Sequence, residues 1–216
     1  MSETVITYLL SNPDSAEPMD RKKFYEEQTQ LFKDGKPPSK AVEIVDILIF
    51  NLHKELLIQK RSFDKAHNPG LLDKSMGGHL RWGDTPDYAV MVETVQELQT
   101  PSIVLKTQKD FAKTKEILHN YLETVALIRF EDVKIHILDK IIDGQRFPIA
   151  NKIHLYYGIY NGRVRPVDRE AKGVLWYSLE ELDNEMKKFP DTFTPDIYYL
   201  LTNYRQGLEK FLKTTS

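Results

Sequence analysis

The sequence predicts an α+β protein, or a mixed α/β sandwich, in which antiparallel strands are interspersed with a few helices. Long β-prone apolar runs occur at residues 42–50 and 153–160. Thr85, Ser178 and Thr194 stand where helices can begin. At 216 residues the chain suits one domain with extensions, or two small domains, and we find no internal repeat.

Composition excludes several classes of protein. The chain has 30 basic and 32 acidic residues and a formal net charge of −2, so no nucleic-acid surface is evident. It has no cysteine, which excludes disulfides, thiolate zinc sites and cysteine nucleophiles and fits a reducing compartment. No apolar run approaches a membrane span and no N-terminal signal is visible. We therefore expect a soluble, cytoplasmic protein.

Residues 1–40 are predicted to form an N-terminal arm. A short strand at 4–10 is stopped by residues 12–14. Asp20 is placed to cap a helix over about 21–33. The Gly- and Pro-rich residues 35–38 end that helix. We expect the arm to pack on the domain or on a partner subunit, which leaves a homodimer open.

The main domain, residues 41–216, is expected to begin with a β-hairpin. Its first arm is the run 42–50 and its second is 55–61, followed by a loop at 68–70. A short strand at about 71–76 then leads into a glycine loop at Gly77 and Gly78.

The rest of the domain alternates helices and strands. Thr85 can cap a helix that has Pro86 in its first turn and ends before Pro101. The charged, amphipathic residues 102–121 are predicted to be a helical insertion. Further strands are expected at 124–129, 134–139, 153–160 and 173–177, and further helices at 179–188 and from 194 to about 212.

The helix after Thr85 carries a group of oxygen ligands. Glu93, Gln96 and Glu97 follow i, i+3, i+4 spacing and so share one helical face. Such oxygens suit Mg²⁺ or Mn²⁺ that also holds diphosphate oxygens, and Gly77 and Gly78 let backbone approach the ligand. The alternative is that these residues are only the solvated face of a helix.

This segment resembles the Nudix box, G-x5-E-x7-R-E-U-x-E-E-x-G-U, where U is apolar. Read from Gly78 without a gap, the positions fall on Asp84, Val92-Glu93, Gln96-Glu97 and Gln99. The segments that flank the box resemble the isopentenyl-diphosphate-isomerase-like branch of the same superfamily. These segments are residues 56–62, 68–70, 73–75, 77–79, 174–176, 178–182 and 193–196. The resemblance covers about residues 42–200.

The resemblance implies a Nudix fold, a mixed α/β/α sandwich with a mixed sheet between helices. It also implies that Mg²⁺ or Mn²⁺ is bound by Glu97 as principal ligand, by Glu93 as ligand or general base, and by Gln96 and Gly78. Valine at position 92 cannot make the salt bridge of the family's arginine, and Gln96 brings no charge. Glu170 or Glu123 is a candidate for an additional carboxylate.

Other residues near the motif are candidates for binding the substrate. Lys60, Arg61, Lys74 and Arg81 could bind phosphate oxygens, or be ordinary surface charge. His79 matches a metal-binding histidine of the isomerase, or is a hydrogen-bonding residue of the loop. Glu170 completes the predicted set. Trp82, Tyr156 and Tyr157 could stack on a base, or simply pack the sheet.

Three functions follow from these observations. The first is a metal-dependent hydrolase that cleaves a diphosphate linkage in a nucleoside diphosphate derivative or related small molecule. The second is a catalytically weakened Nudix module that binds a nucleotide or a protein partner. The third is isomerase-like chemistry by carboxylates alone. The resemblance places the isomerase's cysteine near Met76 and Gly77, and this chain has none.

Overall fold

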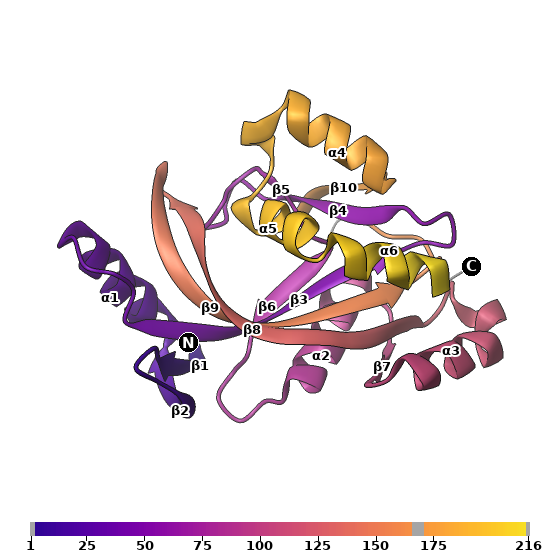
Figure 1. The fold of residues 1–216 in the computed structure, drawn as a ribbon, viewed down its shortest axis with the longest axis horizontal. Coiled ribbons are helices and arrows are strands. Elements are labelled where there is room, and N and C mark those ends of the chain that lie inside the picture. Colours follow the sequence, from indigo (N-terminus) through magenta and orange to yellow (C-terminus); the bar gives the residue numbers. More distant parts are fainter. Residues whose placement is uncertain (1–2, 166–170, 215–216) are drawn as a thin grey trace.

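A computed structural model describes residues 3–165 and 171–214 (Figure 1). Ten strands form one sheet, whose main path is β10-β4-β3-β9-β8-β7. The strands are β1 (Thr4–Leu9), β2 (Asn12–Asp20), β3 (Lys40–Phe50), β4 (Leu56–Arg61), β5 (Leu72–Asp73), β6 (Met76–His79), β7 (Ser102–Leu105), β8 (Ala126–Ile142), β9 (Gln145–Ile159) and β10 (Ala171–Tyr177). The helices are α1 (Arg21–Lys33), α2 (Pro86–Leu98), α3 (Gln108–Ile117), α4 (Leu179–Lys188), α5 (Pro195–Asn203) and α6 (Arg205–Thr214), with 3₁₀ turns η1 (His119–Tyr121) and η2 (Pro190–Thr192).

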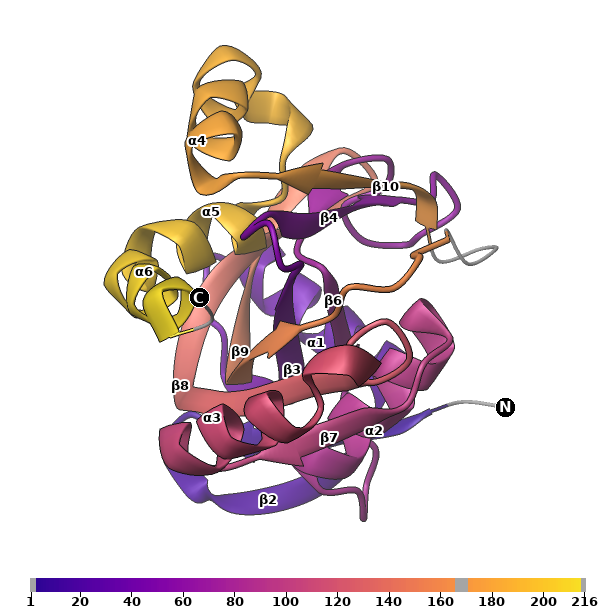
Figure 2. The ribbon, with the colours of Figure 1, turned by 90° about the vertical axis from the view of Figure 1, so that its right-hand side faces the viewer.

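The sheet is mixed and has helices on both faces, which confirms the predicted α+β architecture. Strand β3 runs parallel to β9, and β7 runs parallel to β8, whereas the other pairs are antiparallel. Figure 2 shows α5 and α6 on one side of the sheet and α2 on the other. No helix among the described residues is long and apolar enough to cross a membrane.

Strand β3 is buried on both faces, which explains its continuous apolar sequence. Leu48 and Phe50 pack into the cluster that includes Phe211 of α6. Val45 and Ile47 pack on the opposite face, with Val90 of α2. Asp46 is a charged residue inside this run, and it becomes part of the site described below.

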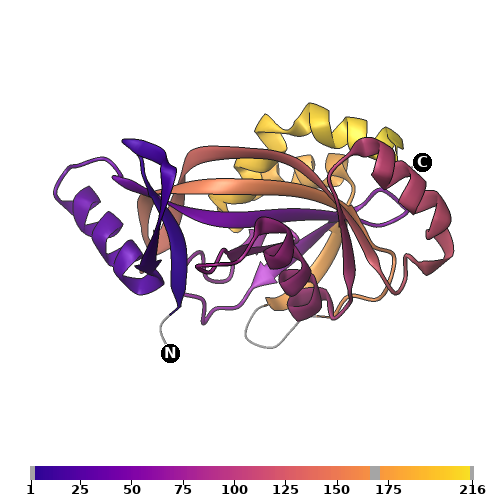
Figure 3. The same cartoon turned by 90° about the horizontal axis from the view of Figure 1, so that it is seen from below.

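The N-terminal arm packs on its own domain. Strand β1 pairs with β3, and α1 begins at Asp20, whose side chain accepts a hydrogen bond from the backbone N–H of Lys23. Figure 3 shows the arm at one end of the molecule, with the C-terminus at the other. Strand β2 was not predicted, because its side chains are mostly exposed and its only contribution to the sheet is main-chain pairing with β1.

Of two predictions around the start of the domain, one is confirmed in part and the other was wrong. Strands β3 and β4 are antiparallel neighbours, as the predicted hairpin requires, but only Phe50 and Leu56 pair, and β4 pairs over more of its length with β10 and β5. Gly77 and Gly78 do not form a loop. They lie in β6, which pairs with β3, and neighbouring side chains occupy the space that a β-carbon would need there.

Three later elements differ from the prediction in extent. The insertion 102–121 contains a strand, β7, in addition to α3 and η1. The strands predicted at 124–129 and 134–139 are one strand, β8, with an irregularity between Phe130 and Asp132. The last helix is two helices, α5 and α6, because it breaks at Tyr204.

Candidate functional site

Helix α2 places two carboxylates against the sheet. Thr85 caps the helix and Pro86 opens it, as the sequence predicted. Glu97 is 8% exposed, and its Oε2 accepts a hydrogen bond of 2.7 Å from Gln59 Nε2 on β4. Glu93, one turn earlier, is half-buried, and its carboxylate occupies the space where a side chain on Gly78 would lie. The absence of a β-carbon at Gly78 therefore lets α2 approach β6 closely.

The other box positions lie elsewhere on the helix and its flanks. Gln96 is exposed, whereas Glu97 is buried and Glu93 is half-buried. Val92 is half-buried. Gln99 ends the helix with a left-handed φ of 55°, the conformation that favours glycine. Asp84 is half-buried in the segment before the helix.

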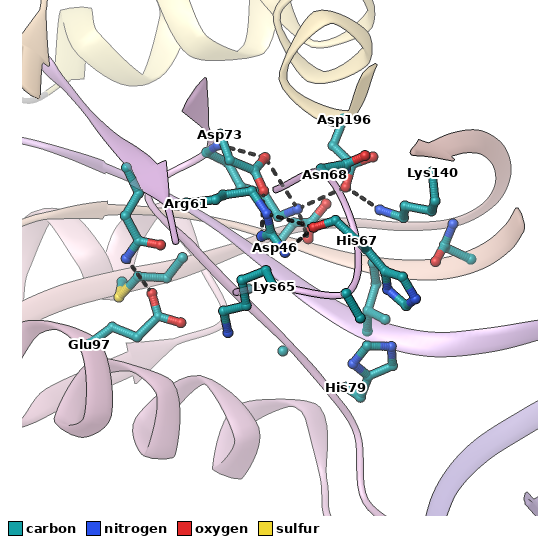
Figure 4. A pocket seen from close by; sticks show the side chains of 18 of the residues that line it. Asp46, Arg61, Lys65, His67, Asn68, Asp73, His79, Glu97, Lys140 and Asp196 are labelled. Carbon is teal, nitrogen blue, oxygen red and sulfur yellow. Dashed lines mark hydrogen bonds and ion pairs between the residues drawn. The ribbon is translucent and has the colours of Figure 1, made fainter. Parts of the chain in front are cut away.

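A polar cavity of about 130 Å³ extends from Glu97 under the loop that follows β4 (Figure 4). Its walls come from β3, β4, β6, α2 and the 65–68 loop, and from β8, β9, α1 and the start of α5. Gly78 and His79 of β6 also line it. The N-terminal arm contributes Arg21 and Tyr25.

A buried network of charges forms part of the cavity wall. Lys74 Nζ is 3.1 Å from Asp46 Oδ1, 3.1 Å from Asp196 Oδ2 and 3.9 Å from Asp73 Oδ1. Asp196 also pairs with Lys140 of β8. The network therefore ties the first turn of α5 to β3, β8 and the segment after β5.

The network determines the charge states of its members. Burial alone would lower the pKa of Lys74, but attraction from the three carboxylates raises it. Burial likewise would raise the pKa of Asp196, but Lys140 and Lys74 hold it below its usual value. Burial raises the pKa of Asp46 to about 6, against the attraction of Lys74.

Two predicted phosphate ligands line the cavity but are already paired. Lys74 is held by the carboxylates of the network. Arg61 Nη1 is 3.0 Å from Asp73 Oδ2, and its guanidinium also donates to the carbonyl oxygen of His67. Their positive charge is therefore largely compensated within the protein.

The other two predicted phosphate ligands, Lys60 and Arg81, are not part of the cavity lining. Lys60 Nζ lies 6.0 Å from the centre of the Phe63 ring. Arg81 pairs with Glu3 of the arm at 3.1 Å, and its side chain is 61% exposed. Glu170 lies outside the described residues. Glu123 is exposed, after η1.

His79 does line the cavity, together with two aromatic residues that we did not predict. The Tyr25 hydroxyl lies 2.9 Å from His79 Nε2, and the ring centres of Tyr25 and His67 are 4.1 Å apart. Burial lowers the pKa of His79 well below its usual value, and nearby cations add to this effect. Burial, followed by the charges of Lys140 and Arg21, lowers the pKa of His67 to about 3. Both imidazoles are neutral at pH 7.

Stacking of a base on the predicted tyrosines is excluded by their burial. Tyr157 is fully buried in the core against Phe211. Tyr156 is equally buried, and its hydroxyl donates to Asp87 Oδ1 at 2.8 Å. Of the three predicted aromatic residues only Trp82 is accessible, at 50% exposure.

Sequence reasoning missed many of the residues that line the cavity. Asp46 offered a signal, because it is a single charge inside an apolar run, but the tertiary structure determines which residues pair with a lone charge. No local pattern identified Tyr25, His67, Asn151 or Asp196 as part of a site.

The described residues contain no group of three or more histidine, aspartate and glutamate side chains arranged to hold a metal ion. Any metal at Glu93 and Glu97 would therefore need further ligands from backbone, water or substrate.

The family model described as NUDIX domain matches residues 41–197 of this chain. The chain is 26% identical over 148 residues to an isopentenyl-diphosphate Delta-isomerase of Serratia proteamaculans, covering 68% of each chain. It is 22% identical over 181 residues to the same-named protein of Streptomyces coelicolor, covering 83% of this chain and 78% of the other. A similar solved structure is DR0079 from Deinococcus radiodurans, with a TM-score of 0.50, 17% identity and coverage of 74% of this chain and 81% of that one.

Proposed function

This chain belongs to the NUDIX domain family, and from that premise we propose that it is a divalent-metal-dependent hydrolase of diphosphate compounds. The observation that carries the proposal is the placement of Glu93 and Glu97. They lie one helical turn apart; the Glu93 carboxylate lies against Gly78, and Glu97 lines the polar cavity.

The residues present fit a metal that is held jointly with the substrate. Mg²⁺ is commonly bound through one or two carboxylates, several waters and substrate phosphates. Glu97 and Glu93, with the backbone of Gly78, would hold Mg²⁺ or Mn²⁺ in this way. When bound, the metal would neutralise phosphate charge and lower the pKa of a water.

The chain's own residues have separate tasks in this proposal. Gln59 keeps one oxygen of Glu97 fixed through its hydrogen bond, so the carboxylate enters the site in one orientation. Glu93 is the candidate to accept the proton of the attacking water, because its carboxylate lies directly over Gly78.

The isomerase activity in the names of the sequence relatives is disfavoured here. The chain has no cysteine. A β-carbon at Gly77 would lie 2.7 Å from Lys74 Cε and 2.9 Å from the carbonyl oxygen of Val45. The position that the resemblance assigns to a reactive side chain is therefore filled by its neighbours.

A hydrolysis assay tests the proposal. Purified protein is mixed with Mg²⁺ or Mn²⁺ and a panel of nucleoside and sugar diphosphates, and the release of monophosphate is measured. Glu97→Gln is expected to abolish turnover, whereas Glu180→Gln, on the exposed face of α4, is expected to retain it. If no compound is hydrolysed with either metal while ligands still raise the melting temperature, the hydrolase proposal is wrong.

A binding module without catalysis is the second candidate, because Gln96 is exposed and uncharged and position 92 holds valine. It predicts a ligand-dependent rise in melting temperature that survives Glu97→Gln. If the double variant Val92→Arg, Gln96→Glu hydrolyses a diphosphate that the wild-type protein does not, the result would support the loss of an ancestral catalytic activity in this chain.

We also propose that the protein acts on a small molecule in the cytoplasm. The absence of cysteine fits a reducing compartment, and the nearly balanced charge does not favour nucleic acid.

A further inference from the structure

Strand β8 leaves a long edge of the sheet open. It forms a hairpin with β9 along most of its length (Figure 1). On the other side of β8, β7 pairs only with residues 126–129. Near the hairpin tip, the N–H of Ile141 donates to Asn68 Oδ1 at 2.8 Å, and its carbonyl oxygen accepts from the Asn68 N–H at 2.9 Å. Among the described residues, no strand pairs with the stretch between these two contacts on that side.

The open backbone groups belong to alternate residues of β8. In an antiparallel pair a residue directs its N–H and its C=O to the same side, and that side alternates along the strand. The bonds between Ile141 and Asn68 show that the odd-numbered residues here point away from β9. Val133 agrees, because its N–H donates to the side chain of Asp132 at 2.9 Å. The N–H and C=O groups of Ile135 therefore also lie at the open edge.

The side chains of the same residues form an apolar stripe. His136 contacts Tyr199 of α5, so the even-numbered side chains face α5 and the odd-numbered ones face the opposite side of the sheet. The odd-numbered stripe is Val133, Ile135 and Ile137, of which Val133 is 40% exposed and Ile137 is 55% exposed. An open strand edge with exposed β-branched side chains is a template for pairing with another strand.

The other edges of the sheet have features that discourage such pairing. Strand β2 contains Pro13 and Pro18, which lack the N–H donor. Strand β7 has only four residues. Strand β10 begins with an irregularity between Ala171 and Gly173. Between residues 133 and 139, β8 has no proline and no irregularity, so its edge is the one suited to accept a strand.

The sequence of this edge is complementary to itself. In an antiparallel pair of two β8 edges with a twofold axis at Ile135, the two Ile135 residues lie opposite each other. Val133 then lies opposite Ile137 of the second copy, and the outward backbone groups of all three residues are in register for hydrogen bonding. On the other face, Lys134 lies opposite His136. Burial lowers the pKa of His136, so its imidazole is neutral at pH 7 and does not repel the lysine.

Neighbouring registers fit less well. An axis at Lys134 would place the two lysines opposite each other, and like charges directly opposite are destabilising. An axis at His136 would place Val133 opposite Asp139. A larger shift in either direction would pair residues whose edge is already occupied by β7 or by the 65–68 loop.

We propose that the edge of β8 at residues 133–137 binds a second copy of this chain, so that the two sheets join into one across a twofold axis at Ile135. Three opposed pairs then exchange backbone hydrogen bonds, and the apolar stripes of the two copies meet on the face away from α5. The interface contains none of the residues assigned to hydrolysis, and the inference is therefore independent of the proposed function.

Sedimentation of the full chain over a concentration series tests the interface. The wild-type protein is expected to show a monomer–dimer equilibrium. Ile137→Lys should weaken the dimer at least tenfold, because it places a charge against Val133 of the second copy, and its exposed position should leave the melting temperature unchanged. Val95→Lys is the matched control, since Val95 is 56% exposed on α2, outside the interface.

Single cysteines test the register, and the absence of native cysteine keeps the readout clean. Opposed residues of a hydrogen-bonded pair have Cα atoms about 5.5 Å apart, which a disulfide can bridge. Ile135→Cys is therefore expected to give a disulfide-linked dimer on oxidation. The Ile137→Cys positions of the two copies would be offset by four residues, roughly 13 Å along the strands, and should not link. Val95→Cys is the control.

Three outcomes would overturn the inference. The first is a monomer at every concentration up to about 1 mM, where even a weak dimer would form. The second is a dimer that Ile137→Lys leaves unchanged, which would use another surface. The third is equal cross-linking of all three cysteine variants, which would reflect random collision. Selective linking through Ile135→Cys, together with the loss of dimer in Ile137→Lys, supports the inference.

Discussion

Gln59 on β4 donates its side-chain amide to Glu97 on α2, with 2.7 Å between Nε2 and Oε2. In the Nudix box that this segment resembles, the arginine at the position of Val92 orients the glutamates through a salt bridge. This chain has valine there. The hydrogen bond from β4 is thus a second way to fix a carboxylate whose own helix lacks the arginine. It also holds the carboxylate without neutralising its charge.

Replacing Gln59 by leucine is expected to weaken metal binding at Glu97. Outer hydrogen-bond partners of metal ligands typically contribute about 10–100-fold in metal affinity or activity. Titration with Mn²⁺, followed by electron paramagnetic resonance, should show at least a tenfold loss in affinity. Gln108→Leu, on the exposed start of α3, is the matched control. Unchanged Mn²⁺ affinity in Gln59→Leu would contradict the role assigned to this hydrogen bond.

Substituting alanine for Gly78 is expected to displace the Glu93 carboxylate, because the new β-carbon would occupy its position. The clash involves the flexible end of a side chain, so the melting temperature should change little while turnover falls at least tenfold. Gly173→Ala in β10 is the control, since nothing lies within 4 Å of its β-carbon position. Retention of full turnover in Gly78→Ala would show that Glu93 acts from another position.

Removing Asp196 is expected to destabilise the protein. Asp196→Ala leaves Lys140 and Lys74 buried with fewer counter-charges, and breaking a buried ion pair in this way typically costs about 3–5 kcal/mol. Urea unfolding should report a loss in that range. Asp191→Ala, exposed in η2, should change stability by less than about 0.5 kcal/mol. A loss below about 1 kcal/mol for Asp196→Ala would mean that the network contributes little.

The raised pKa of Asp46 predicts a pH dependence of stability. Its pKa is about 6 in the folded protein and 3.8 in the reference state, so the folded form binds the proton more tightly. The stabilisation from this proton is complete below about pH 4 and is lost as the pH rises through about 6, by roughly 1–3 kcal/mol. Relative to Asp46→Asn, the wild-type free energy of unfolding should fall between pH 4.5 and 7. A constant difference over this range would contradict the assignment.

Sequence alone predicted the elements whose signals are local. The caps at Asp20, Thr85 and Ser178 mark real helix starts, because a capping side chain bonds to backbone within its own first turn. The apolar run of β3 marked a strand buried on both faces. The spacing from Gly78 to Glu97 identified the family, and the match over residues 41–197 confirms it.

Tertiary structure decided which residues meet. Lys74 and Asp196 are 122 positions apart, and Tyr25 and His79 are 54 apart, yet each pair is in contact. No periodicity encodes such contacts, because they depend on how the sheet curls and on where α1 and α5 pack. For the same reason Lys74 and Arg61 were predicted from the sequence to be phosphate ligands, whereas in the fold both pair with carboxylates. The motif lies within one continuous stretch of the sequence, whereas the cavity is lined by residues from many parts of the chain that only the fold brings together.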